Sequence, residues 1–248
     1  MKVDSLPRFY YKSSMPNFSQ FDSRNQAMHG YEGSLCGPIA VSNILIYLAR
    51  RNFQMLLPPM GNQTELQAHF KLVEKLTKCM RTSKKTGTHW HDAIEGIEKY
   101  ICERGYKVKI SYDEGSCDLS GCRKVNNPAQ IMKSVIGPSN AILSIAWCRV
   151  TPSSLKYWQT GEHFATLAGF ARSEVNKLII HDPGFSSTRA PEYAELQEIK
   201  KGFCKYWVDR KFHSAEGFYE LDGIEIDTEK GANRAVLDGI IEFEVFRK

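Results

Sequence analysis

Residues 33–45 of this chain read GSLCGPIAVSNIL, and this stretch decides the predicted fold. Pro38 suits the first turn of a helix, because the N–H that proline lacks would have no partner there. The residues that follow, through Arg51, are apolar on almost every side, which is typical of a helix buried in a core. The stretch therefore predicts a central buried helix with Cys36 at its N-terminal end.

Two amphipathic helices and several strands are predicted around this helix. Apolar residues recur at helical spacing over residues 64–80 and again after Thr88, and the second pattern stops at Gly105. The period then changes to two, which predicts a strand at 106–112. The other predicted elements are a short helix at 128–136, strands at 141–147, 163–171, 177–182 and 239–246, and, as one option, a helix at 191–201.

This order of elements predicts an α+β protein with a single domain spanning residues 1–248. Helical patterns crowd the first half, so we expect a helical lobe over about residues 1–105, packed on an antiparallel β-rich lobe over about residues 106–248. A chain of 248 residues lies near the upper end of single-domain size, and no repeat or long linker divides it.

Composition argues against several classes of protein. The net charge of +5 is too small to indicate nucleic acid binding by itself. The longest nearly apolar run, residues 39–49, is shorter than the roughly 20 residues that a membrane-spanning helix needs. No apolar block follows Lys2, so no secretory signal is predicted. The 7 cysteines form no CxxC pair, which favours free thiols in a reducing compartment and a cytoplasmic location.

Cys36 is the predicted nucleophile. A helix N-terminus carries unpaired N–H groups and about half a positive charge, which stabilises a thiolate and lowers the pKa of a cysteine. Gly37 is expected to let a reactant approach the backbone, and the Cys36 N–H to face a developing oxyanion. The alternative interpretation, adopted for the other cysteines, is a small buried hydrophobic residue.

A base and its orienting partner are predicted on two neighbouring strands. His163 begins the apolar strand GEHFATLAGF, and Asp182 ends the next strand in IIHDPG. If these strands pair antiparallel through a turn at 172–176, Asp182 lies beside His163 and can orient its imidazole. Each residue alone has an ordinary explanation, a half-buried histidine and a turn residue before Pro183. Together with Cys36 they predict a Cys-His-Asp triad.

The segment CGPIAVSNIL resembles the nucleophile helix of the papain-like cysteine peptidase superfamily, in particular stand-alone relatives of the bacteriocin-processing (double-glycine leader) peptidase family. In that family Cys-Gly-Pro opens the helix, Gly-His brings the base and Asp-Pro ends the following strand, which matches Cys36, His163 and Asp182. The resemblance implies a papain-like fold and an upstream glutamine as oxyanion donor. The segment MPNFSQ points to Gln20 for this role, and Gln26 is the second choice.

The chain departs from the family pattern beside the base, because Glu162 stands between Gly161 and His163. The strand HFATLAGF also resembles the corresponding strand of phytochelatin synthase, another papain-like enzyme. This second resemblance makes γ-glutamylcysteine transfer an alternative reaction.

The sequence thus predicts a cysteine hydrolase, peptidase, amidase or related acyl transferase, acting on a peptide or protein without a metal or organic cofactor. A second class of function is a catalytically silent papain-like module that binds a peptide or protein. His89 with His91, and Cys117 with Cys122, are poor templates for zinc without a second ligand pair, and a capped helix start and two loop thiols are the favoured interpretation. Basic and aromatic residues alternate over 200–212, which is more typical of a solvated face than of a nucleic acid site.

Overall fold

The structure is a computed structural model. It describes residues 6–22, 24, 30–31, 33–59, 61, 64–114, 127–151, 153–173, 175–184, 190–205, 212–228 and 231–248. Gln26, Cys117 and Cys122 lie outside the described residues, and so does most of the second half of the basic and aromatic stretch, residues 206–211.

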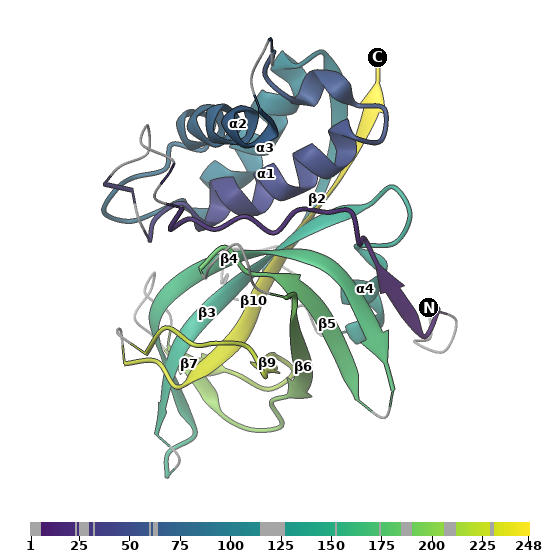
Figure 1. Cartoon of the computed structure of the whole chain (residues 1–248). Helices are drawn as coiled ribbons and strands as arrows, with labels where there is room; N and C mark the ends of the chain where they lie inside the picture. The colour runs from purple at the N-terminus through teal and green to yellow at the C-terminus, as the bar shows by residue number, and fades with distance from the viewer. Residues whose placement is uncertain are drawn as a thin grey trace.

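Three helices pack together on one side of the molecule (Figure 1). Helix α1 (Cys36–Ala49) is buried along its whole length, and α2 (Glu65–Cys79) and α3 (Trp90–Glu103) cover it with their apolar faces. A short 3-10 helix, η3 (Gln54–Leu56), follows α1. The predicted buried helix and both amphipathic helices are confirmed. Within the described part of the chain, none of the helices is long and apolar enough to cross a membrane.

The strands form one large sheet that closes on itself. β3 pairs with β4, β4 with β5, β5 with β6, β6 with β9, and β9 with β10, all antiparallel. β10 also pairs antiparallel with β3, which closes the circle. The short strand β7 pairs parallel with β4, so the sheet is mixed. The prediction of a wholly antiparallel sheet was wrong in this respect. The α+β class is confirmed. The elements are β1 (Phe9–Tyr11), β2 (Tyr106–Glu114), α4 (Pro128–Lys133), β3 (Asn140–Thr151), β4 (Lys156–Arg172), β5 (Asn176–His181), β6 (Glu192–Glu198), β7 (Phe203–Lys205), β8 (Phe212–Ser214), β9 (Tyr219–Asp222) and β10 (Arg234–Arg247).

Alternate residues of the closed strands face two different cores. Leu143 and Ile145 of β3, with Leu167 of β4, belong to the core enclosed by the strands. Ile142 and Phe164, which have the opposite parity, pack instead in the core that contains α1. Because side chains alternate across a strand, one sheet fills its own interior and also supports the helices.

Strand β6 corrects one sequence prediction. Residues 191–201, for which a helix was one option, contain a strand paired with β5 and β9. Ala194 and Leu196 are buried, whereas Tyr193 is exposed, which is the period of a strand. Alanine, glutamate and leucine favour a helix locally, but pairing with two neighbouring strands overrides that preference.

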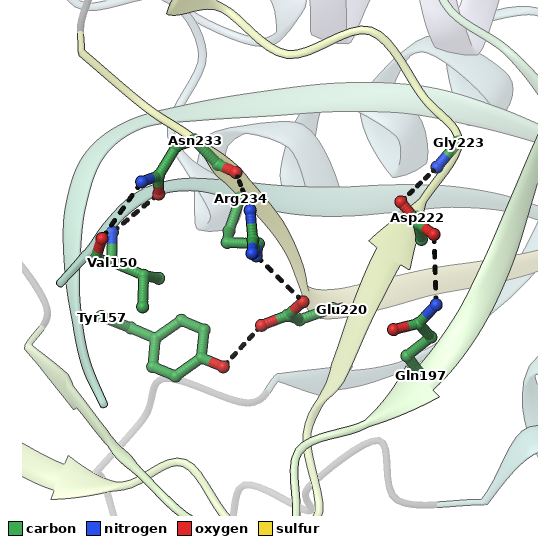
Figure 2. Close-up of polar contacts among 8 residues, drawn as sticks. All are labelled: Val150, Tyr157, Gln197, Glu220, Asp222, Gly223, Asn233 and Arg234. Carbon is green, nitrogen blue, oxygen red and sulfur yellow. Dashed lines mark hydrogen bonds and ion pairs between the residues drawn. The ribbon is translucent and has the colours of Figure 1, made fainter. Parts of the chain in front are cut away.

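Polar side chains join β3, β4, β9 and β10 where these strands meet (Figure 2). Asn233 accepts a hydrogen bond from Val150 N–H at 2.8 Å and donates to Val150 O at 3.1 Å. Glu220 accepts from the Tyr157 hydroxyl at 2.5 Å and pairs with Arg234 at 3.3 Å. These contacts support the closure of the sheet, since β9 and β10 themselves share only a short ladder.

The described segment that follows β1 forms neither a helix nor a strand. Residues 12–22, which we call the strap, follow the junction between the helices and the sheet (Figure 1). Lys12 begins the strap and is only 3% exposed. Its Nζ donates to Ser139 O at 2.5 Å and to Asn140 Oδ1 at 2.8 Å, both neutral oxygens. Burial, with repulsion from Arg51, lowers the pKa of Lys12 from 10.5 to about 8.

This buried lysine gives a testable prediction about stability. A lysine whose pKa is lower in the folded state takes up protons on unfolding between pH 8 and 10.5, so its contribution to stability rises with pH in that window. The free energy of unfolding of the wild type should therefore gain about 2 kcal/mol between pH 7 and pH 9.5 relative to Lys12→Met. Urea unfolding of both proteins at the two pH values measures this. Parallel pH profiles would contradict the assignment.

Candidate active site

Cys36, His163 and Asp182 meet where α1 packs on the sheet. Asp182 Oδ1 lies 2.7 Å from His163 Nε2. The same imidazole interacts with the Cys36 thiol, and with Nε2 bound to the carboxylate, Nδ1 is the ring nitrogen that remains for the sulfur. The three residues are 7%, 6% and 6% exposed, respectively. The structure therefore brings together all three residues of the triad predicted from the sequence.

The pairing of β4 with β5 places the base beside the carboxylate. The two strands are antiparallel, as predicted, with Thr166 opposite His181. Asp182 follows His181 directly, so it lies along the part of β4 that carries His163. The predicted pairing of these two strands is confirmed.

Thr166 also fixes the nucleophile helix to the base strand. Its hydroxyl donates to Ala40 O at 2.9 Å and accepts from Asn43 Nδ2 at 3.4 Å. Both partners are on α1, within two turns of Cys36. These bonds, three residues from His163 on β4, limit sliding between the helix and the strand that carry the reacting groups.

The turn after β5 packs closely against the His163 ring. Gly184 N–H donates to Asp182 Oδ1 at 2.6 Å, so one carboxylate oxygen binds both the imidazole and the turn. A Cβ at Gly184 would lie 2.9 Å from this oxygen and 3.3 Å from His163 Cε1. A larger residue at this position would press on the pair, which explains the glycine.

The electrostatics favour a charged thiolate and imidazolium. Burial alone would raise the pKa of Cys36, but the hydrogen bond and charge of His163, with backbone bonds from Phe164 and Gly37, outweigh burial and lower it. Burial would likewise lower the pKa of His163, but Asp182 and Cys36 raise it well above the ordinary value. The positive imidazolium of His163 stabilises the Cys36 thiolate, and the negative thiolate in turn stabilises the imidazolium.

Gln20 lies beside this pair and is held from two sides. Its backbone N–H donates to Pro183 O at 2.9 Å, and its side-chain Oε1 accepts from Leu35 N–H at 3.1 Å. A backbone N–H can only donate, so the amide oxygen must face Leu35 and the NH2 group is the remaining donor. Leu35 precedes Cys36, so the first choice for an oxyanion donor reaches the start of the nucleophile helix.

Two neighbours of the triad were not foreseen from the sequence. The Trp147 ring stacks on the His163 imidazole, with ring centroids 5.4 Å apart and an interplanar angle of 24°. Phe164 contributes the backbone bond to Cys36 noted above. Trp147 was predicted only as part of a buried strand. Its contact depends on the register of β3 against β4, with Ile145 opposite His163, and a pattern of residues does not reveal register.

Gly37 has a different role from the one predicted. A Cβ there would lie 3.0 Å from Thr88 Oγ1 and 3.4 Å from the Phe164 ring. The space next to the backbone is therefore filled by protein and is not open to a reactant. The small residue is needed so that the segment before α3 can pack against the first turn of α1.

Among the described residues, Glu162, His89 and His91 form no hydrogen bond to the triad. Glu162 is exposed and accepts a hydrogen bond from Gln159 Nε2 at 3.1 Å, away from the triad. His89 is the N-cap of α3 and His91 lies in its first turn. Among the residues that the structure describes, no three His, Cys, Asp or Glu side chains are grouped to hold a metal ion.

Comparisons of the chain with protein-family models, curated proteins and solved structures found no match. The function is therefore argued from the geometry of Cys36, His163, Asp182 and Gln20.

The lowered pKa of Cys36 gives a prediction that needs no substrate. An ordinary thiol with a pKa of about 8.5 is less than one per cent thiolate at pH 6. Iodoacetamide at pH 6 should therefore label Cys36 before Cys102, a free and exposed cysteine, although Cys36 is buried. His163→Ala should slow the labelling of Cys36 markedly at pH 6 and less at pH 9. Mass spectrometry of peptides reads both sites, and equal rates at Cys36 and Cys102 would show that the thiol is not activated.

Proposed function

We propose that this protein is a cysteine hydrolase or acyl transferase with a papain-like fold, acting on an amide or thioester bond of a peptide or protein. The observation that carries the proposal is the buried contact of the Cys36 thiol with a His163–Asp182 pair at a helix N-terminus. A helical unit built round a buried nucleophile helix, packed on a sheet that carries the base and the acid, supports the papain-like fold.

In the first step the Cys36 thiolate attacks the carbonyl carbon of the substrate, and the carbonyl oxygen becomes an oxyanion. Gln20 Nε2 and the Cys36 N–H are the donors for this oxyanion. The intermediate collapses as His163 donates a proton to the leaving amine or thiol, which leaves a thioester on Cys36.

In the second step neutral His163 takes a proton from water, or from another acceptor, as that group attacks the thioester. The tetrahedral intermediate then expels the Cys36 thiolate, and the imidazolium–thiolate pair is restored. Asp182 accepts from His163 Nε2, which keeps Nδ1 directed at the sulfur and stabilises the imidazolium. These residues perform both steps without a metal or organic cofactor.

Two alternatives differ in what they predict for the thiol. A silent papain-like module for binding peptides or proteins has no need of an activated Cys36, so rapid labelling at pH 6 counts against it. A γ-glutamylcysteine transferase resembling phytochelatin synthase needs the same activated thiol, and it is distinguished by transfer to a thiol peptide in place of water. Hydrolysis is favoured here only because it requires no second substrate site.

We also propose a reducing compartment, such as the cytoplasm, as the location. A nucleophilic thiolate is easily oxidised, and Cys36, Cys79, Cys102 and Cys148 carry free thiols. An environment that keeps thiols reduced preserves Cys36 for catalysis.

The triad gives an ordered set of effects on catalysis. Cys36→Ala should abolish turnover, and His163→Ala should reduce it more than Asp182→Asn, because asparagine keeps an oxygen that accepts from both His163 and Gly184. Release of p-nitrophenolate from p-nitrophenyl acetate measures acylation, and peptide libraries then identify a substrate. Circular dichroism checks that each variant is folded. Activity of Cys36→Ala within tenfold of the wild type would refute the nucleophile, and a larger loss for Asp182→Asn would refute the orienting role.

The oxyanion donor gives a separate prediction. Gln20→Ala should lower the acylation rate by roughly a hundredfold or more, because a missing oxyanion donor typically costs that much. Iodoacetamide alkylation of Cys36 should change little, since displacement of iodide forms no oxyanion. Gln26→Ala is the matched control and should be near wild type. If Gln26→Ala is the damaging change, the donor has been misassigned.

A further inference from the structure

Three consecutive residues where β5 ends, His181 to Pro183, each hold a different part of the site. His181 Nδ1 lies 2.9 Å from Pro16 O, and Asp182 Oδ1 binds His163. Pro183 O accepts the backbone N–H of Gln20 at 2.9 Å. One short segment therefore contacts both the base and the strap that carries the oxyanion donor.

His181 is the member of this segment that the mechanism does not use. It is 1% exposed, and both of its ring nitrogens have partners. Pro16 O can only accept, so Nδ1 carries the proton. Burial lowers the pKa of His181 and favours the neutral ring, and in that form Nε2 accepts from the Tyr11 hydroxyl at 3.1 Å. The side chain is therefore a fixed donor to the strap.

The strap is attached alternately to the sheet and to the helices. Pro16 and Gln20 bond to His181 and Pro183, where β5 ends, whereas Phe18, between them, contacts α1 and α2. Phe18 N–H donates to Asn43 Oδ1 at 3.2 Å, and its ring stacks on His69 with centroids 3.8 Å apart. The bond at Pro16 is therefore the attachment of the strap to the sheet on the N-terminal side of Gln20, in addition to the bonds that Gln20 itself makes with Pro183 O and Leu35 N–H.

We propose that His181 is a positioning residue for catalysis: it fixes the strap at Pro16 so that the Gln20 amide points at the oxyanion. This inference rests on the proposed function of the site. An oxyanion donor must lie within about 0.5 Å of its productive position. His181 makes no contact with the thiol or with the reacting atoms, so its effect passes through Gln20 alone.

Isosteric substitutions separate the two bonds of His181. The amide nitrogen of asparagine falls near the position of histidine Nδ1, so His181→Asn keeps the donor to Pro16 O. Glutamine reaches the position of Nε2, so His181→Gln keeps only the contact to Tyr11. His181→Leu removes both, and Tyr11→Phe removes only the hydroxyl and serves as the matched control.

The test compares acylation by p-nitrophenyl acetate, which forms an oxyanion, with alkylation by iodoacetamide, which does not. His181→Leu and His181→Gln should lower kcat for the ester about tenfold with little change in KM, because the lost interaction acts in the transition state. His181→Asn and Tyr11→Phe should stay within about threefold of the wild type. All four variants should alkylate within about twofold of the wild type.

A double-mutant cycle tests whether the effect passes through the glutamine. In the Gln20→Ala background, His181→Leu should cause no further loss in kcat/KM beyond about twofold. Additive losses would overturn the inference, and so would an Asn variant as poor as the Leu variant. Equal losses in acylation and alkylation would overturn it too, because they would locate the defect in the triad.

A structural measurement keeps the inference testable if the protein does not react with the ester at all. Hydrogen exchange at the backbone N–H of Gln20, which donates to Pro183 O, should be at least fivefold faster in His181→Leu than in His181→Asn at a temperature where both are folded. Unchanged exchange would overturn the positioning role. Rapid alkylation with no acylation in the wild type, combined with faster exchange, would instead refute the proposed function and leave the positioning of the strap supported.

Discussion

The register of β4 against its neighbours is the constraint on which the site depends. Side chains alternate along a strand, so a slip of one residue would turn His163 to the other face. The ladder with β5 shifts between Leu167 and Gly169, which is a β-bulge that resets the alternation before the base is reached. A Cβ at Gly169 would lie 2.2 Å from Tyr10 O, so β1 packs directly on the bulge. Close backbone packing at Gly169, six residues from His163, thus helps to set the direction of the imidazole.

Charge burial is the cost of this arrangement. A thiolate and an imidazolium are held where little water reaches them, and such pairs are stable only when hydrogen bonds replace the lost hydration. Backbone N–H groups of Gly37, Phe164 and Gly184 supply part of this. Asp182 Oδ2 is buried without a partner among the described residues, so the carboxylate is not fully satisfied. Apolar residues of similar size would be expected to cost less here, so a contribution to stability does not explain this group of residues.

The sequence contained the local part of this site but not the long-range part. Cys36 could be found from Cys-Gly-Pro before an apolar run, and Asp182 from the antiparallel pairing that a turn at 172–176 predicted. The helix considered for residues 191–201 was wrong, because alanine and glutamate favour a helix locally but pairing with β5 and β9 makes this segment a strand. The space predicted beside Gly37 for a reactant is occupied by Thr88, which lies in a distant segment of the sequence. The contact of His181 with Pro16 spans 165 residues, and no periodic pattern reports such a pairing.

The distances along the chain bear on how the thiol is controlled. Cys36 lies on a helix, His163 on a strand, Asp182 directly after the next strand, and Gln20 on the strap that bonds to both layers. Bringing these segments together closes loops of more than a hundred residues between Cys36 and His163, and only the packing of helices on sheet can offset that entropy. The partners that lower the pKa of Cys36 are therefore absent until both layers have packed, and the thiol of an unfolded chain has ordinary reactivity. Activation of Cys36 is in this sense a property of the completed junction, and a loosened junction would lose the oxyanion donor and the base together.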